Sequence, residues 1–298
     1  MIDAGVLVPG ATAGFIGLGR MGNPMARRLA GAGYRILGYD VSEAARASWA
    51  ADVPDAEPVP DVAAAADAAD AVILMLPDSS VVTTVLIRDG LLSAVSAGTV
   101  IVDMSSSEPQ VTRDLAAAAA ERGVTVVDAP VSGGVTGARQ GSLTVMAGGP
   151  AAAVERVRAM LGVMGSRVLH VGESGAGHAV KALNNLLSGT HLLVTSEAMA
   201  AAAEFGLDVP AVLDAINTSS GRSGSTENKW PNYIVPETFD SGFPLRLLLK
   251  DMRIALGLAG SAGTPARLSA AATEIWAEAA AGLPADADHT EIARWLKT

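Results

Sequence analysis

Short apolar runs rich in β-branched residues alternate with amphipathic or alanine-rich segments as far as about residue 171. The apolar runs predict strands at 12–16, 34–40, 71–76, 99–104, 124–129, 142–149 and 167–171. The intervening segments predict helices at 25–33, 41–50, 61–69, 79–95, 107–122 and 150–162. Strands that alternate with helices in this way are typical of an α/β domain with a largely parallel sheet.

The pattern changes near Gly175. A long helical pattern without proline runs over 177–205. Further helices are predicted at 210–217, 245–261, 265–281 and 290–297. The chain is therefore expected to have a short loose tail at 1–11, an α/β domain at 12–174 and an all-α domain at 175–298, with the long helix joining the two domains.

A glycine-rich motif, G-x-G-x-x-G, directly follows the first predicted strand and opens a helix. Gly17 permits the tight strand-to-helix turn, Gly19 lets the backbone approach a pyrophosphate, and Gly22 lets the helix pack closely on the strand. The helix N-terminus then presents free N–H groups to the phosphates. The motif therefore predicts a Rossmann-type dinucleotide-binding domain.

An acidic residue follows the second predicted strand, at the position where such domains bind the adenosine ribose. Asp40 lies 40 − 22 = 18 residues after the last glycine of the motif. A carboxylate there accepts hydrogen bonds from both ribose hydroxyls of NAD and repels a 2′-phosphate. Val41 and Ser42 follow it, so no arginine stands ready to hold that phosphate. NAD is therefore the expected cofactor and NADP the less favoured one.

Composition narrows the classes of partner. The formal charge is −10, half of the residues are hydrophobic and 17% are charged, which excludes a disordered chain. An acidic protein lacks the basic surface that binds nucleic acid or an anionic membrane. The absence of cysteine excludes thiol nucleophiles and cysteine-bound metals and is consistent with a cytoplasmic location. No signal peptide, membrane span or metal site is expected, because the four histidines form no ligand pattern.

Four ordered motifs resemble those of the β-hydroxyacid dehydrogenases, the family of 3-hydroxyisobutyrate dehydrogenase and tartronate semialdehyde reductase. They are FIGLGRMGNPMA (15–26), DAPVSGG (128–134), GAGHAVKALNN (175–185) and LLLKD (247–251). The resemblance covers residues 12 to about 260. It implies a Rossmann domain, a long interdomain helix, an all-α C-terminal domain and metal-free hydride transfer.

The resemblance also implies roles for particular residues. The residues implied in cofactor binding are Gly17, Leu18, Gly19, Arg20, Met21, Gly22, Asp40, Leu76, Pro77, Ser106 and Lys250. Those implied in holding the substrate, whose carboxylate lies on the Ser-Gly-Gly loop, are Ser132, Gly133, Gly134, Lys181 and Asn185. Lys181 is the implied catalytic group with Asn185 beside it. Lys250 is expected to close over cofactor and substrate, supported by Asp251.

The residues themselves are compatible with these roles. Oxidation of an alcohol needs a base for the hydroxyl proton, and a lysine serves when its surroundings favour the neutral amine. Lys181 and Asn185 are four residues apart and share one helix face, which Ser188 continues. That polar stripe is either a solvated face or the wall of a site. His178 is expected to pack or to bond to the backbone.

One segment departs from the family pattern. The segment 217–230 resembles a substrate-facing loop in which Gly224 and Ser225 replace a bulky aromatic residue of relatives.

The favoured activity is NAD-dependent interconversion of a small 3-hydroxy acid and its semialdehyde or oxo acid. An imine reductase on the same fold and an inactive dinucleotide-binding scaffold are the alternatives. A homodimer or homotetramer built through the α domain is expected; the identity of the acid and the physiological direction are not determined.

Overall fold

The computed structural model describes residues 5–53 and 56–297. The chain divides into two compact units, residues 1–181 and 182–298. The division falls inside α9 (Ala176–Glu204), a helix of 29 residues that belongs to both units. The domain boundary expected at 174/175 stays a prediction.

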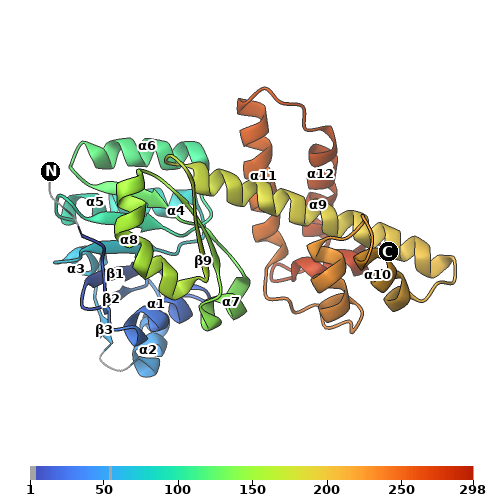
Figure 1. Ribbon diagram of the computed structural model, residues 1–298, viewed down its shortest axis with the longest axis horizontal. Coiled ribbons are helices and arrows are strands. Elements are labelled where there is room, and N and C mark those ends of the chain that lie inside the picture. Colours follow the sequence, from blue (N-terminus) through green and yellow to red (C-terminus); the bar gives the residue numbers. More distant parts are fainter. Residues whose placement is uncertain (1–4, 54–55, 298) are drawn as a thin grey trace. The chain divides into compact units, whose positions relative to one another are not determined.

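The first unit is built on one sheet (Figure 1). Its strands are β1 Thr12–Ile16, β2 Arg35–Tyr39, β3 Glu57–Pro58, β4 Ala71–Leu74, β5 Val100–Asp103, β6 Thr125–Asp128, β7 Val131–Ser132, β8 Thr144–Gly148 and β9 Arg167–Gly172. Their order is β3-β2-β1-β4-β5-β6-β8-β7, with β9 also paired to β8. The first six strands have the Rossmann order and are parallel, which confirms the predicted fold class. The β6–β8 and β7–β8 pairs are antiparallel.

Helices cover both faces of this sheet because the strands are apolar on both sides. In β4, Ala71 and Ile73 belong to one core, and Val72 and Leu74 belong to the other. The helices of the first core are α1 Gly22–Gly31, α2 Glu43–Asp52 and α8 Ala151–Met164. Those of the second core are α3 Val62–Ala66, α4 Ser79–Thr83, η1 Thr84–Arg88, α5 Leu91–Ala94 and α6 Pro109–Ala120.

Two local expectations differ from the structure. The helix expected over 79–95 is divided into α4, the π-helical η1 and α5, because Gly90, with φ +81°, precedes α5. The expected loose tail is attached to the unit from Leu7 onward, and its first four residues lie outside the described residues. Leu7 is 8% exposed, its N–H donates to the Arg156 carbonyl at 2.8 Å, and its carbonyl accepts from Tyr34 Oη at 3.0 Å.

The second unit is helical, as the sequence pattern predicts. After α9 it contains α10 Val209–Asn217, η2 Ser225–Ile234, α11 Leu245–Ser261, α12 Arg267–Gly282, η3 His289–Glu291 and α13 Ile292–Trp295. The expectation of a loop over 217–230 is wrong in its second half, where η2 is a π-helix. Burial of Trp230 and Ile234 in the helical core stabilises η2 although Pro231 lies inside it. No helix in the described part of the chain is long and apolar enough to cross a membrane.

Candidate active site

The glycine turn after β1 has the geometry that a dinucleotide requires. Gly17 has φ +101°, and a Cβ there would collide with the carbonyl of Met75. A Cβ on Gly22 would collide with the carbonyl of Gly17, so the start of α1 packs directly on the turn. Around Gly19, in contrast, a Cβ would meet nothing within 4 Å. The first and third glycines are therefore needed by the fold, and the second leaves an open approach to the backbone, as the pyrophosphate of NAD needs.

Asp40 lies directly after β2 and is held against this turn. Its Oδ2 accepts the N–H of Leu18 at 2.8 Å, and its Oδ1 accepts the N–H of Ser42 at 2.8 Å. These bonds fix the carboxylate, and each oxygen has further lone pairs for ribose hydroxyls. The residue thus fits the ribose of NAD. Arg46 donates to the carbonyl of Asp40, and its guanidinium lies 5.8 Å from the centre of the Tyr39 ring.

The ends of β4 and β5 carry the predicted nicotinamide-side residues. β4 lies between β1 and β5, so Leu76, Pro77 and Ser106 follow strands at the edge where Rossmann sheets bind their cofactor. The N–H of Leu76 donates to Ser105 Oγ at 2.9 Å and joins the two strand ends. Ser105 is buried while Ser106 is partly accessible. Sequence reasoning missed Ser105, because its role depends on a partner 29 residues away.

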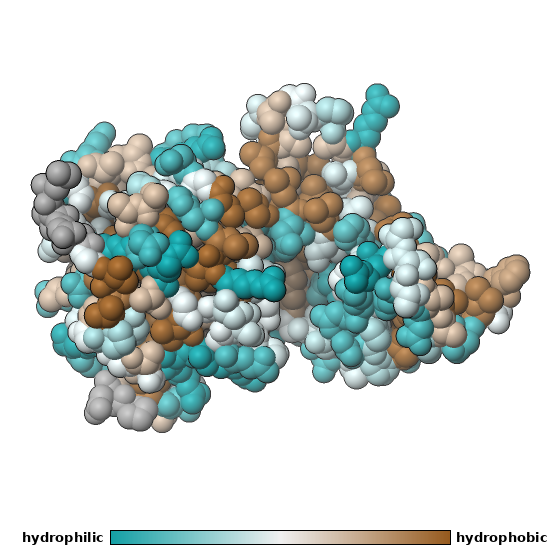
Figure 2. Space-filling view, viewed as in Figure 1, coloured by the Kyte–Doolittle hydropathy of each residue, from teal (hydrophilic) through white to brown (hydrophobic). Residues whose placement is uncertain are grey.

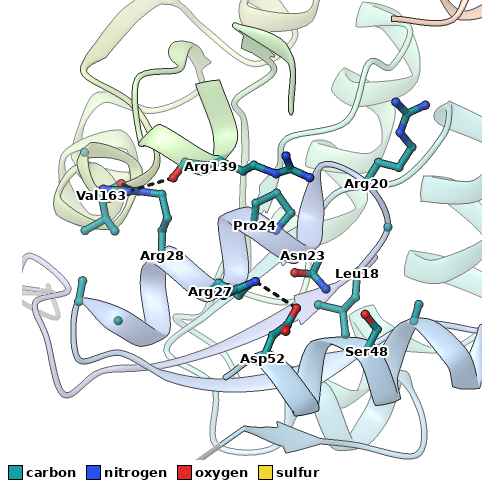
Figure 3. A pocket seen from close by; sticks show the side chains of 15 residues that line it. Leu18, Arg20, Asn23, Pro24, Arg27, Arg28, Ser48, Asp52, Arg139 and Val163 are labelled. Atoms are coloured by element: carbon teal, nitrogen blue, oxygen red, sulfur yellow. Dashed lines mark hydrogen bonds and ion pairs between the residues drawn. The ribbon is translucent and has the colours of Figure 1, made fainter. Parts of the chain in front are cut away.

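A hollow of about 990 Å³ adjoins the glycine turn (Figure 3). Leu18, Gly19 and Arg20 form part of its wall, so it is continuous with the predicted cofactor loop. Its other polar lining residues include Asn23, Arg27, Arg28, Ser48, Asp52 and Arg139. Arg27 pairs with Asp52 at 3.0 Å, and Arg28 Nε donates to the Val163 carbonyl at 2.9 Å. The sequence pattern gave no indication of this basic hollow, which forms from segments far apart in the chain.

The predicted carboxylate loop lies between β7 and α7 (Gly134–Gln140). Ser132 ends the strand and is partly accessible, and Gly133 and Gly134 are exposed. Both glycines have positive φ, +133° and +62°, a conformation that side chains disfavour. A Cβ on Gly134 would meet nothing within 4 Å. The loop therefore presents accessible backbone next to a serine hydroxyl, which suits it to hold a carboxylate.

Two buried carboxylates lie next to the beginning of α9, and one of them, Asp128, holds it by hydrogen bonds. Asp128, at the end of β6, accepts the N–H of Gly175 at 2.8 Å and that of His178 at 3.0 Å. Asp103, at the end of β5, accepts the N–H of Ser105 at 3.0 Å and the hydroxyl of Ser107 at 3.0 Å. Neither aspartate was identified from the sequence. Because Asp128 anchors α9 at the carboxyl end of β6, the first turns of this helix lie at the cofactor-binding edge.

The His178 ring is enclosed between these two carboxylates. Its Nε2 lies 3.2 Å from the Ser105 carbonyl and its Nδ1 lies 2.7 Å from Thr112 Oγ1. A carbonyl only accepts, so Nε2 carries a proton. The ring is fully buried, with Asp103 Oδ2 at 3.8 Å and Asp128 Oδ2 at 4.0 Å. His178 is therefore a structural residue of α9, as expected, and Lys181 follows it three residues later.

The remaining predicted residues lie in the helical unit. Asn185, on α9, donates from Nδ2 to Oδ2 of Asp251, on α11, at 2.6 Å. Lys250 Nζ lies 3.3 Å from Oδ1 of the same carboxylate. Asn185 and Asp251 are both buried, and Lys250 is partly exposed. The structure thus joins Asn185, Lys250 and Asp251 in one polar group, and Lys181 precedes Asn185 by one turn of α9.

Groups of three or more His, Asp or Glu side chains placed to hold a metal ion are not found within residues 5–53 and 56–297. The candidate site consists of lysine, amide, hydroxyl and backbone groups. This set can take up and return a proton and can hold a carboxylate beside a dinucleotide.

Comparisons with known proteins agree with this geometry. Residues 12–172 match the family model of the NAD binding domain of 6-phosphogluconate dehydrogenase, and residues 175–296 match the model described as NAD-binding of NADP-dependent 3-hydroxyisobutyrate dehydrogenase. The 2-(hydroxymethyl)glutarate dehydrogenase of Eubacterium barkeri is 41% identical over 264 residues, 88% of this chain and 87% of that protein.

Solved structures extend the comparison. The 3-hydroxyisobutyrate dehydrogenase of Mycobacterium tuberculosis, solved with L-serine, is 31% identical with a TM-score of 0.90 over 97% of this chain and 99% of that one. An imine reductase of Streptomyces aurantiacus is 23% identical with a TM-score of 0.65 over 96% and 99% of the two chains, a likeness that shows the fold alone. The chain therefore belongs to the β-hydroxyacid dehydrogenases and is an NAD-dependent oxidoreductase that acts on the CH–OH group of a hydroxy acid.

Proposed function

We propose that this enzyme interconverts a small 3-hydroxy acid and its semialdehyde or oxo acid, with Lys181 as the acid–base group. The observation that carries the proposal is the anchoring of α9. Asp128 and His178 fix the first turn of that helix at the strand edge that binds the dinucleotide, and Lys181 lies one turn further along. A lysine at this edge is within the unit that also holds the glycine turn and the Ser132 loop.

In this proposal NAD, when bound, accepts the hydride from the carbinol carbon. Lys181 takes the hydroxyl proton in oxidation and returns it in reduction. Ser132 and the backbone of Gly133 and Gly134 hold the carboxylate. Asn185 orients the substrate oxygen, and Lys250 contributes positive charge on the cofactor side. The Asp251 carboxylate positions Asn185 and Lys250 through its two oxygens.

The alternatives are less well supported. Reduction of an imine finds support only in the fold, since the imine reductase is 23% identical. An inactive scaffold would not need Lys181, the Ser132 loop and the Asp251 group together. Substrates named for the relatives, 3-hydroxyisobutyrate, L-serine and 2-(hydroxymethyl)glutarate, define the candidate acids. A homo-oligomeric state and a cytoplasmic location are also part of the proposal.

The test is NADH formation, followed by absorbance, when the purified enzyme is given NAD and each of these three acids. An amine panel with NADPH, assayed in the direction of imine reduction, serves as the contrasting arm. We expect turnover of at least one hydroxy acid. Turnover confined to imines, or to none of the compounds, would overturn the proposal.

A further inference from the structure

Lys229 is a partly buried lysine that the proposed reaction does not use. It lies on η2, and its Nζ donates to Ser188 Oγ at 2.7 Å and contacts the Ser188 carbonyl at 3.4 Å. Ser188 lies three residues after Asn185 and seven after Lys181 on α9, so all three share one helix face. The Lys229 ammonium therefore lies within one turn of the Asn185–Asp251 pair, inside the helical unit.

No carboxylate in the described part of the chain touches the Lys229 ammonium directly. Within the described residues it forms no ion pair, whereas Lys250 is paired with Asp251. Asp288 is the carboxylate whose charge acts on Lys229, but its oxygens already accept hydrogen bonds from other groups. The donors to Asp288 include the Ser241 hydroxyl, the Thr290 hydroxyl and the N–H groups of Gly242, Phe243 and Thr290.

Burial lowers the pKa of Lys229 to about 8, although the charge of Asp288 opposes this. The side chain is still mainly an ammonium at neutral pH. A partly desolvated cation that forms no direct ion pair is unfavourable, and such groups are typical of functional sites. π-Helical segments like η2 are also frequent at functional sites. An incoming anion would supply a direct ion-pair partner.

We propose that Lys229 binds a second carboxylate of the substrate, so that the enzyme prefers a 3-hydroxy acid that is also a dicarboxylic acid. This inference rests on the function proposed above. Asn185 and Ser188 are separated by about 4.5 Å along the helix axis, at about 1.5 Å per residue. A short aliphatic chain spans that distance, so one carboxylate reaches Lys229 while the carbinol carbon lies near Asn185.

The test compares one substrate with a single carboxylate, 3-hydroxyisobutyrate, and one with two, 2-(hydroxymethyl)glutarate. In Lys229→Met we expect kcat/KM for the dicarboxylate to fall about tenfold or more, mainly through KM, because a charged hydrogen-bond partner is lost. Activity with the monocarboxylate should stay within about threefold. Lys229→Arg, which keeps the charge, should retain part of the preference. Lys297→Met, which removes an exposed lysine, is the matched control.

A pH series gives an independent readout. Asp288 stays ionised and His289 stays neutral between pH 7 and 9, because hydrogen bonds hold the pKa of Asp288 low despite burial and burial lowers that of His289. Deprotonation of Lys229 should therefore raise KM for the dicarboxylate above pH 8 in the wild type and not in Lys229→Met.

Several outcomes would overturn this inference. If kcat/KM of Lys229→Met falls equally with both substrates, Lys229 has a structural role. If kcat/KM is unchanged with both substrates, Lys229 does not contact the substrate. A wild-type preference for the monocarboxylate would also contradict it. Each of these results leaves the proposed function intact, whereas absence of NADH formation with every hydroxy acid refutes the proposed function itself.

Discussion

The amide of Asn185 on α9 and the carboxylate of Asp251 on α11 form a hydrogen bond of 2.6 Å although the residues are 66 positions apart. Both side chains are buried. The other oxygen of Asp251 lies 3.3 Å from Lys250 Nζ. One carboxylate thus orients an amide and a cation that both have proposed roles in the reaction.

Asp251→Asn should lower kcat about tenfold or more, because the substitution keeps the shape but removes the charge that holds Lys250 and Asn185. Loss of a buried charged acceptor should also reduce the free energy of unfolding by about 1–3 kcal/mol. Steady-state kinetics and urea unfolding measure the two effects. Asp214→Asn, at an exposed position of α10, is the control. Wild-type kcat in Asp251→Asn would show that the pair has no positioning role.

Lys181→Ala should lower kcat/KM by at least about 10², because removal of an acid–base group costs about 10²–10⁴ in rate. The dissociation constant for NADH should change by less than about tenfold. Lys181→Arg should not restore activity, since a guanidinium stays protonated. Kinetics and NADH fluorescence titration on the same variants test this. Retention of more than about a tenth of the activity, or joint loss of activity and NADH binding, would contradict the acid–base role.

Two alanine substitutions in the glycine turn should have opposite consequences for the fold. Gly19→Ala adds a methyl group where nothing lies within 4 Å, so thermal stability should be unchanged while NADH binding weakens about tenfold or more. Gly22→Ala drives a methyl group into the Gly17 carbonyl and should also lower the melting temperature. Calorimetry and NADH titration separate the effects. Tight NADH binding by Gly19→Ala would mean that the pyrophosphate lies elsewhere.

The wild type should prefer NAD over NADP by about 2–3 kcal/mol in kcat/KM, since Asp40 binds ribose hydroxyls and repels a 2′-phosphate. Asp40→Asn removes the charge with little change in shape and should reduce this preference. Kinetics with both cofactors give the ratio. Equal efficiency of the wild type with NAD and NADP is the result that would count against this role of Asp40.

The helical unit should associate with a second copy of the chain. Apolar side chains lie at the surface (Figure 2), and on α9 Leu183, Leu187 and Val194 are 42%, 58% and 54% exposed. Stable homodimer interfaces bury surface of this kind. Light scattering at micromolar concentration should give a molar mass that is a multiple of the 30.0 kDa chain mass. The substitution Leu187→Asp should lower this measured mass. A wild-type mass of one chain would refute the expectation.

Most of the fold could be predicted from local pattern. The strand at Thr12–Ile16 and the helix at Leu245–Ser261 have the predicted bounds, because strong periodicity and nearby glycine or proline define them. η2 could not be predicted in this way. Its sequence is polar and contains Pro231, and burial of Trp230, a tertiary effect, stabilises it.

The parts of the candidate site that lie in a sequence motif could be predicted, whereas the parts that depend on long-range contacts could not. Gly17, Asp40 and Lys181 belong to recognisable patterns. The contacts of Asp128 with α9 and of Lys229 with Ser188 could not be predicted, because these partners lie 50 and 41 residues away in the chain. No periodicity or spacing in a single sequence records such a pair.

The capping of α9 by Asp128 affects where this protein can be divided into separately expressed fragments. The first N–H groups of a helix need acceptors, and here the acceptor comes from β6 rather than from the residues next to α9. Expression of residues 175–298 alone would separate Gly175 and His178 from that carboxylate and expose the buried His178 ring to water. Such a fragment should fray at its amino terminus as far as the turn that bears Lys181. A division of the gene before residue 175 would therefore destabilise the helical turn on which the proposed chemistry depends.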